Sequence, residues 1–340
     1  MKPEQKSLRI GAAAILFAVL LRFFGSGLVS DLTALFTDPR ASALMLYAGT
    51  GRVYPLSADT AASVTEPEAP PASEPEPTEQ EDAQPTEPAQ AVFSQADALL
   101  ISLTNHPGYS FDTEALLTAP LTWNLTGSAP TVLIVHSHTC ESYKNTEGYQ
   151  ETGAYRTTDQ RYNMVSVGAY LAQCLQERGI SVLHDTTVHD YPSYNASYTL
   201  SRETVQEYLT KYPSIRLVLD IHRDAYEDRN GNQIRNTVTV NGTTASKLMV
   251  VAGTNAYGEG HTNWQENLSV ALKLQTVLER MYPGLCRPLA LRSSAFNQDL
   301  SPGALLIEVG TAGDTRQDAL NAAAFLAEGI AALAYGSESA

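Results

Sequence analysis

Histidines and carboxylates follow or interrupt three apolar segments of this sequence. In an open α/β sheet, ligands bind outside the carboxyl ends of the strands, so the residues after each apolar segment are the first place to look for chemistry. The three segments and their polar residues are Thr131–Val135 with His136, His138 and Glu141; Leu217–Leu219 with Asp220, His222, Arg223 and Asp224; and Leu305–Gly310 with Glu308. If these segments are neighbouring strands, imidazoles and carboxylates from distant parts of the chain converge.

The spacing His138-x-x-Glu141, joined by the distant His222, fits a zinc site. Two imidazoles, one carboxylate and a fourth position open to water indicate a catalytic site, because a structural site closes that position with protein. Zinc acidifies water and polarises a scissile carbonyl. A further carboxylate must then accept the proton of the water and pass it to the leaving nitrogen. We assign this role to Glu308, because a glutamate inside an apolar strand is costly unless it has a partner or a function.

Other polar residues near these positions have weaker assignments. We expect His136 to be a hydrogen-bonding residue behind the ligands. Asp220 or Asp224 could orient the second ring nitrogen of His222, or simply cap a loop. Arg223 is the second catalytic candidate, as a group that stabilises an oxyanion or binds a substrate carboxylate, with a pair to Asp224 as the alternative. The remaining histidines are expected to shape the rim of the site (His184, His189) or to have no catalytic role (His106, His261).

Apolar, β-rich segments alternate with segments of helical periodicity, which predicts an α/β fold with a mostly parallel sheet flanked by helices on both faces. The expected strands are 131–136, 180–184, 215–221 and 304–309, and the expected helices are 161–178, 201–211, 263–281 and 316–334. One β-hairpin insertion is expected, with strands 237–240 and 248–252 around Asn241-Gly242, and it should add antiparallel strands at an edge of the sheet. We assign residues 92–340 to one domain.

Composition excludes some classes of protein. The formal net charge of −15 argues against nucleic acid as a partner, because phosphate binding needs clustered Lys and Arg. Nine acids and no Lys or Arg lie in residues 57–91, so much of this charge belongs to a Pro-rich linker, which we expect to be disordered. The 3 cysteines do not predict a disulfide framework, and without a C-x-x-C pair they do not support a thiolate zinc site.

The N-terminus predicts export. Residues 1–9 carry Lys2, Lys6 and Arg9, and an apolar stretch interrupted by Arg22 covers residues 10–29, close to the ~20 residues that a membrane span needs. We interpret residues 1–9 as a cytoplasmic tail, 10–29 as an uncleaved anchor and 30–56 as a juxtamembrane segment. A cleaved signal peptide is the alternative. In either case the positive flank stays inside and the domain is extracytoplasmic.

Taken together, several segments resemble the stage II sporulation protein P family. They cover most of residues 130–310 and are VLIVHSHTCESY (132–143), HDYPSYNASYTLSR (189–202), DIHRDA (220–225), VVAGTN (250–255), HTNWQENL (261–268), YPGLCR (282–287) and NQDLSPGALLIEVG (297–310).

This resemblance implies a zinc-dependent N-acetylmuramoyl-L-alanine amidase, also credited with endopeptidase cleavage of crosslinked peptidoglycan during engulfment in endospore formation. It implies a fold similar to that of the zinc amidases and, more remotely, the zinc carboxypeptidases. The histidines of the family carry over to His138 and His222, and its strand-borne glutamate to Glu308. The carboxylate ligand is Glu141 by the carboxypeptidase pattern, which we prefer, or Asp159 by the amidase pattern.

The resemblance also implies a location and partners. The protein would be a single-pass protein of the mother-cell or septal membrane, and its partners would be a sporulation lytic transglycosylase and a polytopic membrane protein that recruits both. Two alternatives to the zinc amidase remain. One is a catalytically inactive wall-binding scaffold, and the other is a cysteine hydrolase that uses Cys140 with a nearby histidine.

Overall fold

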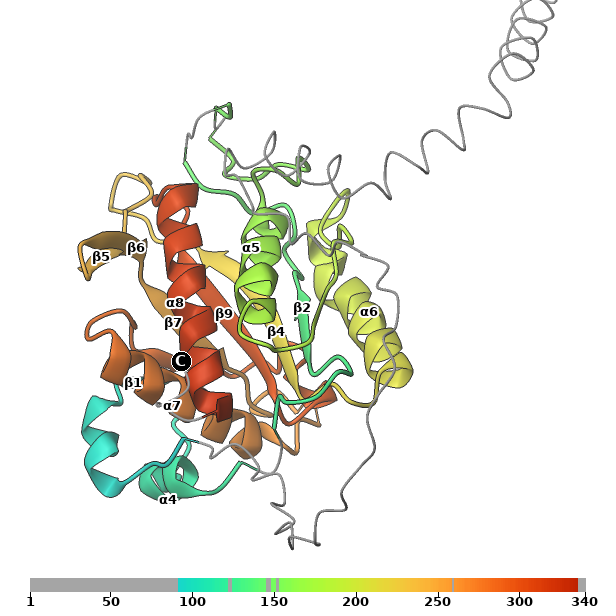
Figure 1. Ribbon diagram of the computed structural model, residues 1–340. Coiled ribbons are helices and arrows are strands. Elements are labelled where there is room, and N and C mark those ends of the chain that lie inside the picture. Colours follow the sequence, from blue (N-terminus) through green and yellow to red (C-terminus); the bar gives the residue numbers. More distant parts are fainter. Residues whose placement is uncertain (1–90, 122–123, 145–147, 151–152, 259, 336–340) are drawn as a thin grey trace, which may run out of the picture. The chain divides into compact units, whose positions relative to one another are not determined.

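A seven-stranded sheet forms the centre of the computed structural model, which describes residues 91–335 except 122–123, 145–147, 151–152 and 259 (Figure 1). The strand order is β1-β8-β7-β9-β4-β2-β3. The strands of this sheet are β1 (Leu103–Asn105), β2 (Val132–Val135), β3 (Val182–His184), β4 (Leu217–Asp224), β7 (Leu248–Ala252), β8 (Leu289–Leu291) and β9 (Ala304–Thr311). Every neighbouring pair is parallel except β7 and β9. The sheet therefore consists of two parallel sets of strands that run in opposite directions and meet at β7 and β9.

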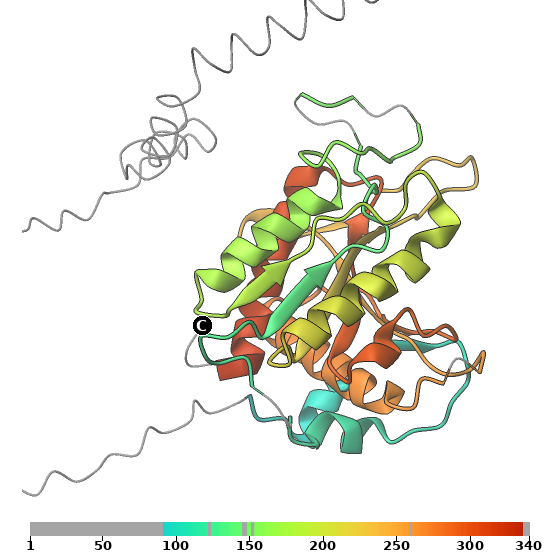
Figure 2. The same cartoon turned by 90° about the vertical axis from the view of Figure 1, so that its right-hand side faces the viewer.

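Helices cover both faces of the sheet, as the alternating pattern predicted. The four long helices are α5 (Met164–Gln176), α6 (Ser197–Lys211), α7 (Trp264–Met281) and α8 (Arg316–Tyr335), and the shorter ones are α4 (Thr113–Thr118) and the 3-10 helices η1 (Gln95–Leu100), η2 (Tyr194–Ala196) and η3 (Gln298–Leu300). Helices α5, α7 and α8 share one apolar core with the sheet, whereas α6 contributes to a separate cluster. Turned by 90°, β2 and β3 lie between α5 and α6 (Figure 2). The fold class expected from the sequence is confirmed.

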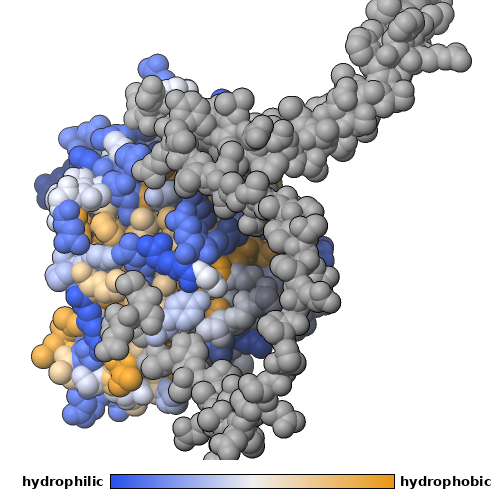
Figure 3. Space-filling model, viewed as in Figure 1, coloured by the Kyte–Doolittle hydropathy of each residue, from blue (hydrophilic) through white to orange (hydrophobic). Residues whose placement is uncertain are grey.

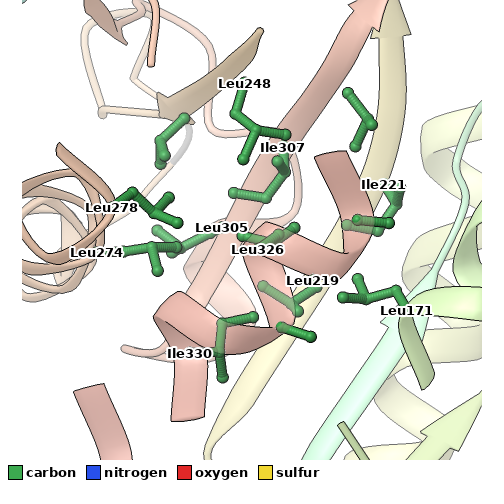
Figure 4. Packing of buried hydrophobic residues seen from close by; sticks show 14 of the residues in the cluster. Leu171, Leu219, Ile221, Leu248, Leu274, Leu278, Leu305, Ile307, Leu326 and Ile330 are labelled. Atoms are coloured by element: carbon green, nitrogen blue, oxygen red, sulfur yellow. The ribbon is translucent and has the colours of Figure 1, made fainter. Parts of the chain in front are cut away.

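The larger core lies between the sheet and helices α5, α7 and α8. Leucines and isoleucines from β4, β7 and β9 meet those of the three helices, as Figure 4 shows for Leu219, Ile307, Leu274 and Leu326. The outer surface on the side viewed in Figure 1 carries hydrophilic side chains interspersed with smaller apolar groups (Figure 3).

Helix α5 comes close to the sheet through Gly168, where an added Cβ would lie 2.5 Å from the His136 ring. A larger residue at this position would displace the His136 and His184 rings.

The predicted hairpin is present, but its second strand differs from the prediction. β5 (Thr237–Val240) pairs with β6 (Thr243–Ser246) in a separate two-stranded sheet. Asn241 and Gly242 form the turn with φ of 50° and 80°, as a tight hairpin turn with two positive φ angles requires. Residues 248–252 are not part of the hairpin. They form β7, which is buried along its whole length inside the main sheet between β8 and β9, so the predicted edge position is wrong.

The register of β9 sets the direction of each of its side chains. Leu305, Ile307 and Val309 face the core shared with α7 and α8, while Leu306 belongs to a small apolar cluster on the opposite face. Glu308 alternates in step with Leu306 and therefore faces the same side. In the parallel pair of β4 and β9, His222 is the direct partner of Glu308. The pattern that buries the core thus places an imidazole and a carboxyl side by side.

Residues 10–29, the predicted anchor, lie outside the described residues, as do residues 57–90 of the predicted linker. Within the described part of the chain, none of the helices combines the length and the hydrophobicity needed to cross a membrane. The described residues fall in a single compact unit, and the predicted boundary at residue 92 stays a prediction.

Lys273 on α7 is a buried cation and gives a testable pH dependence of stability. It is 1% exposed, and its Nζ donates to the carbonyl oxygen of Leu116 and to Ser269 Oγ. Burial lowers its pKa from 10.5 to about 8. Between these values the unfolded chain binds more protons than the folded one, so the free energy of unfolding rises with pH over this range.

We expect Lys273→Met to raise the free energy of unfolding at pH 7, by an amount on the order of 1–3 kcal/mol, because it removes a buried charge at the cost of two hydrogen bonds. The advantage should shrink as the pH approaches 10. Urea unfolding at both pH values measures it, with the exposed Lys211→Met as the control. Equal differences at pH 7 and pH 10 would contradict the assignment.

Candidate active site

Three strands bring the predicted residues to one cavity of about 350 Å³ on the face of the sheet. His138 and Glu141 follow β2, His222 lies in β4 and Glu308 lies in β9. The floor is apolar and comes from β7 and β9, and Tyr194 of η2 and Tyr198 in the first turn of α6 form one wall. The lining residues are His138, Glu141, Tyr194, Tyr198, His222, Arg223, Asp224, Ala225, Met249, Val251, Arg292, Phe296, Leu306 and Glu308. A neighbouring cavity of about 390 Å³ shares Tyr198 and Phe296.

His222 lies between two carboxylates. Its Nε2 is 2.8 Å from Asp220 Oδ1, and its Nδ1 is 3.5 Å from Glu141 Oε2. Burial opposes the charged imidazole, but Asp220 and Glu141 outweigh burial and raise the pKa of His222 well above its usual value. His222 in turn helps to lower the pKa of Asp220 to about 2 against the effect of burial. This position therefore stabilises positive charge, and Asp220 is the residue that orients the second ring nitrogen of His222.

His138 stands across the cavity from His222, and its ring is held by aromatic contacts. The two imidazole rings are 5.3 Å apart and nearly perpendicular. Tyr194 stacks on His138 at 4.3 Å, and Tyr198 packs edge-on at 5.4 Å. Burial and then the charge of His222 lower the pKa of His138, which favours the neutral imidazole that binds metals.

Glu141 and Arg223 form a buried pair. The guanidinium of Arg223 donates to Glu141 Oε1 at 3.2 Å and to the carbonyl oxygens of Ser142 and Tyr155. Burial disfavours the carboxylate, but Arg223 and then His222 lower the pKa of Glu141 to about 2. Because each nitrogen of the guanidinium already donates to the protein, the geometry favours a role for Arg223 in positioning Glu141. Its predicted catalytic role stays a prediction.

Glu308 is half-buried in β9, and one oxygen of its carboxyl is buried. Its Oε2 has no hydrogen-bond partner within the described part of the chain. Burial raises its pKa to about 8, with His222 opposing the shift and Glu141 adding to it. A carboxyl whose pKa lies near neutrality can both accept and release a proton at physiological pH, as a general base and acid must.

The donor set fits a zinc ion in several respects. The 3.5 Å between His222 Nδ1 and Glu141 Oε2 matches the ~3.4 Å edge of a tetrahedron with ~2.1 Å bonds. The 5.3 Å between the His138 and His222 rings matches the ~5.2 Å expected for two imidazoles on one tetrahedral ion. His138 Nδ1 is buried without a hydrogen-bond partner among the described residues.

The three side chains are not drawn together into a closed cluster. In the ranges that the structure describes, no group of at least three His, Cys, Asp or Glu residues lies close enough to hold a metal ion in the arrangement seen. The residue types, the pair distances and the unsatisfied nitrogen of His138 agree with zinc, and the assignment of His138, Glu141 and His222 as ligands remains a proposal.

Asp159, the alternative carboxylate ligand, does not line the cavity. Its side chain pairs with Arg161 at 2.6 Å at the surface, and this pair lowers its pKa. Of the two carboxylates considered from the sequence, the structure places Glu141 beside His222.

The other histidines of this region make structural hydrogen bonds. His136 Nδ1 donates to the Ile221 carbonyl oxygen, and its Nε2 lies 2.9 Å from His184 Nε2. Burial lowers the pKa of His136 to about 3 and that of His184 to about 4. His189 bonds to the carbonyl oxygen of His136 and to Thr204. Neither His184 nor His189 is among the residues that line the cavity, contrary to the expectation from the sequence that they shape its rim.

Cys140 does not have the environment of a nucleophile. Burial and the hydrogen bond to Asp190 raise its pKa to about 12, so the thiol stays protonated at neutral pH. For the zinc hydrolase that the family resemblance implies, we expect Cys140→Ser to keep wall hydrolysis within about twofold of the unaltered chain, while a zinc chelator abolishes it in both. Release of soluble fragments from purified peptidoglycan measures both effects. Loss of hydrolysis in a folded Cys140→Ser variant would favour the cysteine hydrolase instead.

Three residues around His138 (Asp190, Tyr194 and Tyr198) were not singled out as site residues from the sequence. Asp190 is buried, accepts hydrogen bonds from Cys140 N and Arg156, and lies 3.9 Å from His138 Nδ1. Tyr194 and Tyr198 are held against His138 by the start of α6. A signal was present in the Tyr-rich segment HDYPSYNASY, but nothing in the sequence fixed which of its side chains would reach the ligands.

Among solved structures, the chain is similar to an N-acetylmuramoyl-L-alanine amidase from Clostridium difficile 630, with 17% identity and a TM-score of 0.33 over 60% of this chain and 94% of that chain. It is also similar to the N-acetylmuramyl-L-alanine amidase Ami1 from Mycobacterium smegmatis, with 13% identity and a TM-score of 0.34 over 62% of this chain and 98% of that chain. Likenesses with such TM-scores are too loose to assign a function.

Sequence comparison is more specific. A protein of Bacillus subtilis (strain 168), stage II sporulation protein P, is 29% identical over 214 residues, which are 58% of this chain and 50% of that protein. The chain thus matches about half the length of this curated relative. The family described as stage II sporulation protein P matches residues 50–331. This match spans most of the sequence, from the predicted juxtamembrane segment to α8, and the chain belongs to the stage II sporulation protein P family.

Proposed function

We propose that this chain is a zinc-dependent peptidoglycan hydrolase that cleaves the N-acetylmuramoyl-L-alanine amide bond, with cleavage of crosslinked stem peptides as a second activity. The observation that carries the proposal is the position of Glu308. A half-buried carboxyl, whose Oε2 has no hydrogen-bond partner among the described residues, stands beside His222 in a cavity that also holds His138 and Glu141. Membership of the sporulation family supports the wall as the substrate.

A zinc ion held by His138, Glu141 and His222 would supply Lewis acidity toward the scissile carbonyl and the attacking water. Glu308 accepts a proton from that water as its oxygen bonds to the carbonyl carbon. The same carboxyl then gives the proton to the amide nitrogen as the carbon–nitrogen bond breaks, so that an acid and an amine leave. One group thus acts as base and then as acid, and the proton that it takes from the water is the proton that the leaving nitrogen receives.

The surrounding residues hold this arrangement in place. Asp220 accepts from His222 Nε2 and so keeps Nδ1 directed to the cavity. Arg223 fixes Glu141 through a hydrogen bond from its backbone nitrogen and another from its guanidinium. Tyr194 and Tyr198 restrict rotation of the His138 ring. Such support keeps reacting groups within the small tolerances that catalysis requires.

The cavity is open enough for a polymer. Its apolar floor of Met249, Val251 and Leu306 lies on the sheet face, and a second cavity adjoins it at Tyr198 and Phe296. Two adjoining cavities are what a substrate with more than one branch at the cleaved bond would need, as a glycan strand with a peptide branch has.

Mass spectrometry of fragments released from purified peptidoglycan by the zinc-loaded full chain tests the proposal. Free lactyl ends on muramic acid identify the amidase, and shortened crossbridges identify the endopeptidase. If the zinc-loaded chain binds the wall but generates no new amino termini, alone or with a lytic transglycosylase, the hydrolase proposal fails and a wall-binding scaffold is the better description.

We further propose that the domain acts in the degradation of septal wall during engulfment, tethered through residues 10–29 to the mother-cell or septal membrane. In this arrangement a sporulation lytic transglycosylase cuts the glycan while this chain removes the peptides, and a polytopic membrane protein recruits both. Family membership supports this proposal. Co-purification of the full chain with both partners from sporulating cells tests it.

A further inference from the structure

Arg292 lies on the cavity wall and has no assigned role. It directly follows β8, and its backbone nitrogen donates to the Ala252 carbonyl oxygen at 2.8 Å, which fixes its Cα beside the end of β7. The side chain is half-buried and lines the same cavity as Glu308 and His222. The backbone of Arg292 is therefore held in place, while its side chain faces the cavity.

The guanidinium of Arg292 makes no hydrogen bond and no ion pair with any residue that the structure describes. Its neighbours differ in this respect. Arg223 in the same cavity is bound to Glu141, Arg287 pairs with Asp224 at 2.7 Å, and Arg202 pairs with Asp299. A half-buried arginine with all its donors free offers a planar fork that matches a carboxylate in two parallel hydrogen bonds.

The floor between Arg292 and Glu308 is apolar. Met249, Val251, Ala290 and Leu306 form a small cluster there, with Phe296 packed against it. An extended peptide could lie on this floor without leaving unpaired polar groups beneath its side chains. Polar groups of a bound peptide can therefore be recognised only at the two ends of this floor, by Arg292 and beside Glu308.

The strand registers give the distance between these ends. Met249 is paired with Glu308, and Ala252 is paired with Leu291, so Arg292 is level with Gly253. Four residues along a strand and two strand spacings across place the two Cα atoms roughly 16 Å apart. Both side chains line the same cavity, and about two or three extended residues at ~3.3 Å each fit between their ends.

We propose that Arg292 forms a carboxylate-binding subsite, which recognises an acidic group on the substrate peptide two or three residues beyond the bond that is cut. The subsite rests on the proposed function, because the peptide is the one that a peptidoglycan hydrolase would hold. Stem peptides carry free carboxylates along their length, and a carboxamide at the same position keeps the shape of the group while it removes the charge.

Binding measurements test the subsite separately from hydrolysis. Two muramoyl peptides that differ only in a carboxylate or a carboxamide at this distance would be titrated calorimetrically into the full chain carrying Glu308→Gln. Chromatography after each titration verifies that the peptide is intact. We expect the carboxylate form to bind roughly 10- to 100-fold more tightly. Arg292→Gln in the same background should remove this preference and leave the affinity for the carboxamide form unchanged.

Two further variants separate a bidentate contact from a general effect of charge. Arg292→Lys keeps the charge but loses the fork, and should keep roughly a tenth of the preference. Arg229→Gln removes an exposed arginine that does not line the cavity, and should keep all of it. If the chain with Arg292→Gln and the chain that keeps Arg292 show the same ratio of affinities for the two peptides, the subsite does not exist.

Kinetics with the otherwise unaltered chain give the second readout. Arg292→Gln should raise KM for the carboxylate peptide with little change in kcat, because the contact lies away from the reacting atoms. An equal loss of kcat for both peptides would overturn the proposal in favour of a structural role. If the peptides bind with the expected preference but are never cut, the proposed hydrolase fails while the subsite stands.

Discussion

Glu308→Gln is expected to lower kcat for amide hydrolysis by about 10²- to 10⁴-fold, the usual contribution of a positioned general base and acid. Glutamine has nearly the same shape but cannot take up the proton of the attacking water. Because Glu308 is not among the proposed ligands, the variant should still bind one zinc ion per chain. Release of fragments from purified peptidoglycan and zinc content by atomic absorption measure the two effects.

The stability of Glu308→Gln distinguishes a catalytic role from a structural one. Burial raises the pKa of Glu308 to about 8 from an ordinary value of 4.5, so the folded metal-free chain binds the extra proton between these values and loses stability as the pH rises through them. A neutral glutamine avoids this loss. We expect the metal-free variant to unfold at the same or a higher urea concentration than the unaltered chain at pH 7.5. A less stable variant, or one with unchanged kcat, would contradict the assignment.

His222→Ala is expected to abolish both zinc binding and hydrolysis. The substitution removes one of the proposed ligands and leaves Asp220 and Glu141 buried without the imidazole between them. Breaking a buried charge network in this way costs about 3–5 kcal/mol, so the variant should also unfold at a lower urea concentration. Equilibrium dialysis against zinc measures the affinity, and urea unfolding of the metal-free chain measures the stability.

Asp220→Asn keeps the proposed ligand His222 but weakens the hydrogen bond that orients its ring, so its effect can be compared with the loss of the ligand itself. Asparagine keeps a hydrogen-bonding group beside His222 Nε2 but removes the charge, and the zinc affinity should fall by roughly 10- to 100-fold without vanishing. His106→Ala, an exposed histidine outside the cavity, is the control and should change neither property. If His222→Ala stays folded and still binds zinc with unchanged affinity, the proposed metal site is wrong.

The sequence was most informative where strands are long and apolar. The ends of β2, β4 and β9 could be recognised because four or more apolar residues precede or surround the polar ones, and parallel pairing then placed His222 beside Glu308. Short strands carry no such signal. β8 has three residues, and β7 follows a convincing hairpin turn at Asn241-Gly242, so its place in the middle of the sheet depends on pairing with β9 that is distant in sequence.

Side-chain partners were harder to predict than strand ends. Arg223 is adjacent to Asp224 in the sequence but pairs with Glu141, and Asp224 pairs with Arg287. Both residues line the cavity at a point where the register of β4 on β9 shifts, so the alternation of a regular strand could not predict their partners. Arg292 escaped notice for a similar reason. Its importance lies in having no partner, which only the surrounding structure can show.

The β9 strand is held at a single position along its neighbours because its alternate side chains are buried on one face. Sliding it by one residue would point Glu308 into the helices and leave Ile307 facing the cavity. The buried leucines and isoleucines of this strand therefore set the direction of Glu308, although the proposed reaction assigns none of them a chemical role. Substitutions that loosen the packing of these side chains should abolish the proposed hydrolysis at temperatures where the chain is still folded.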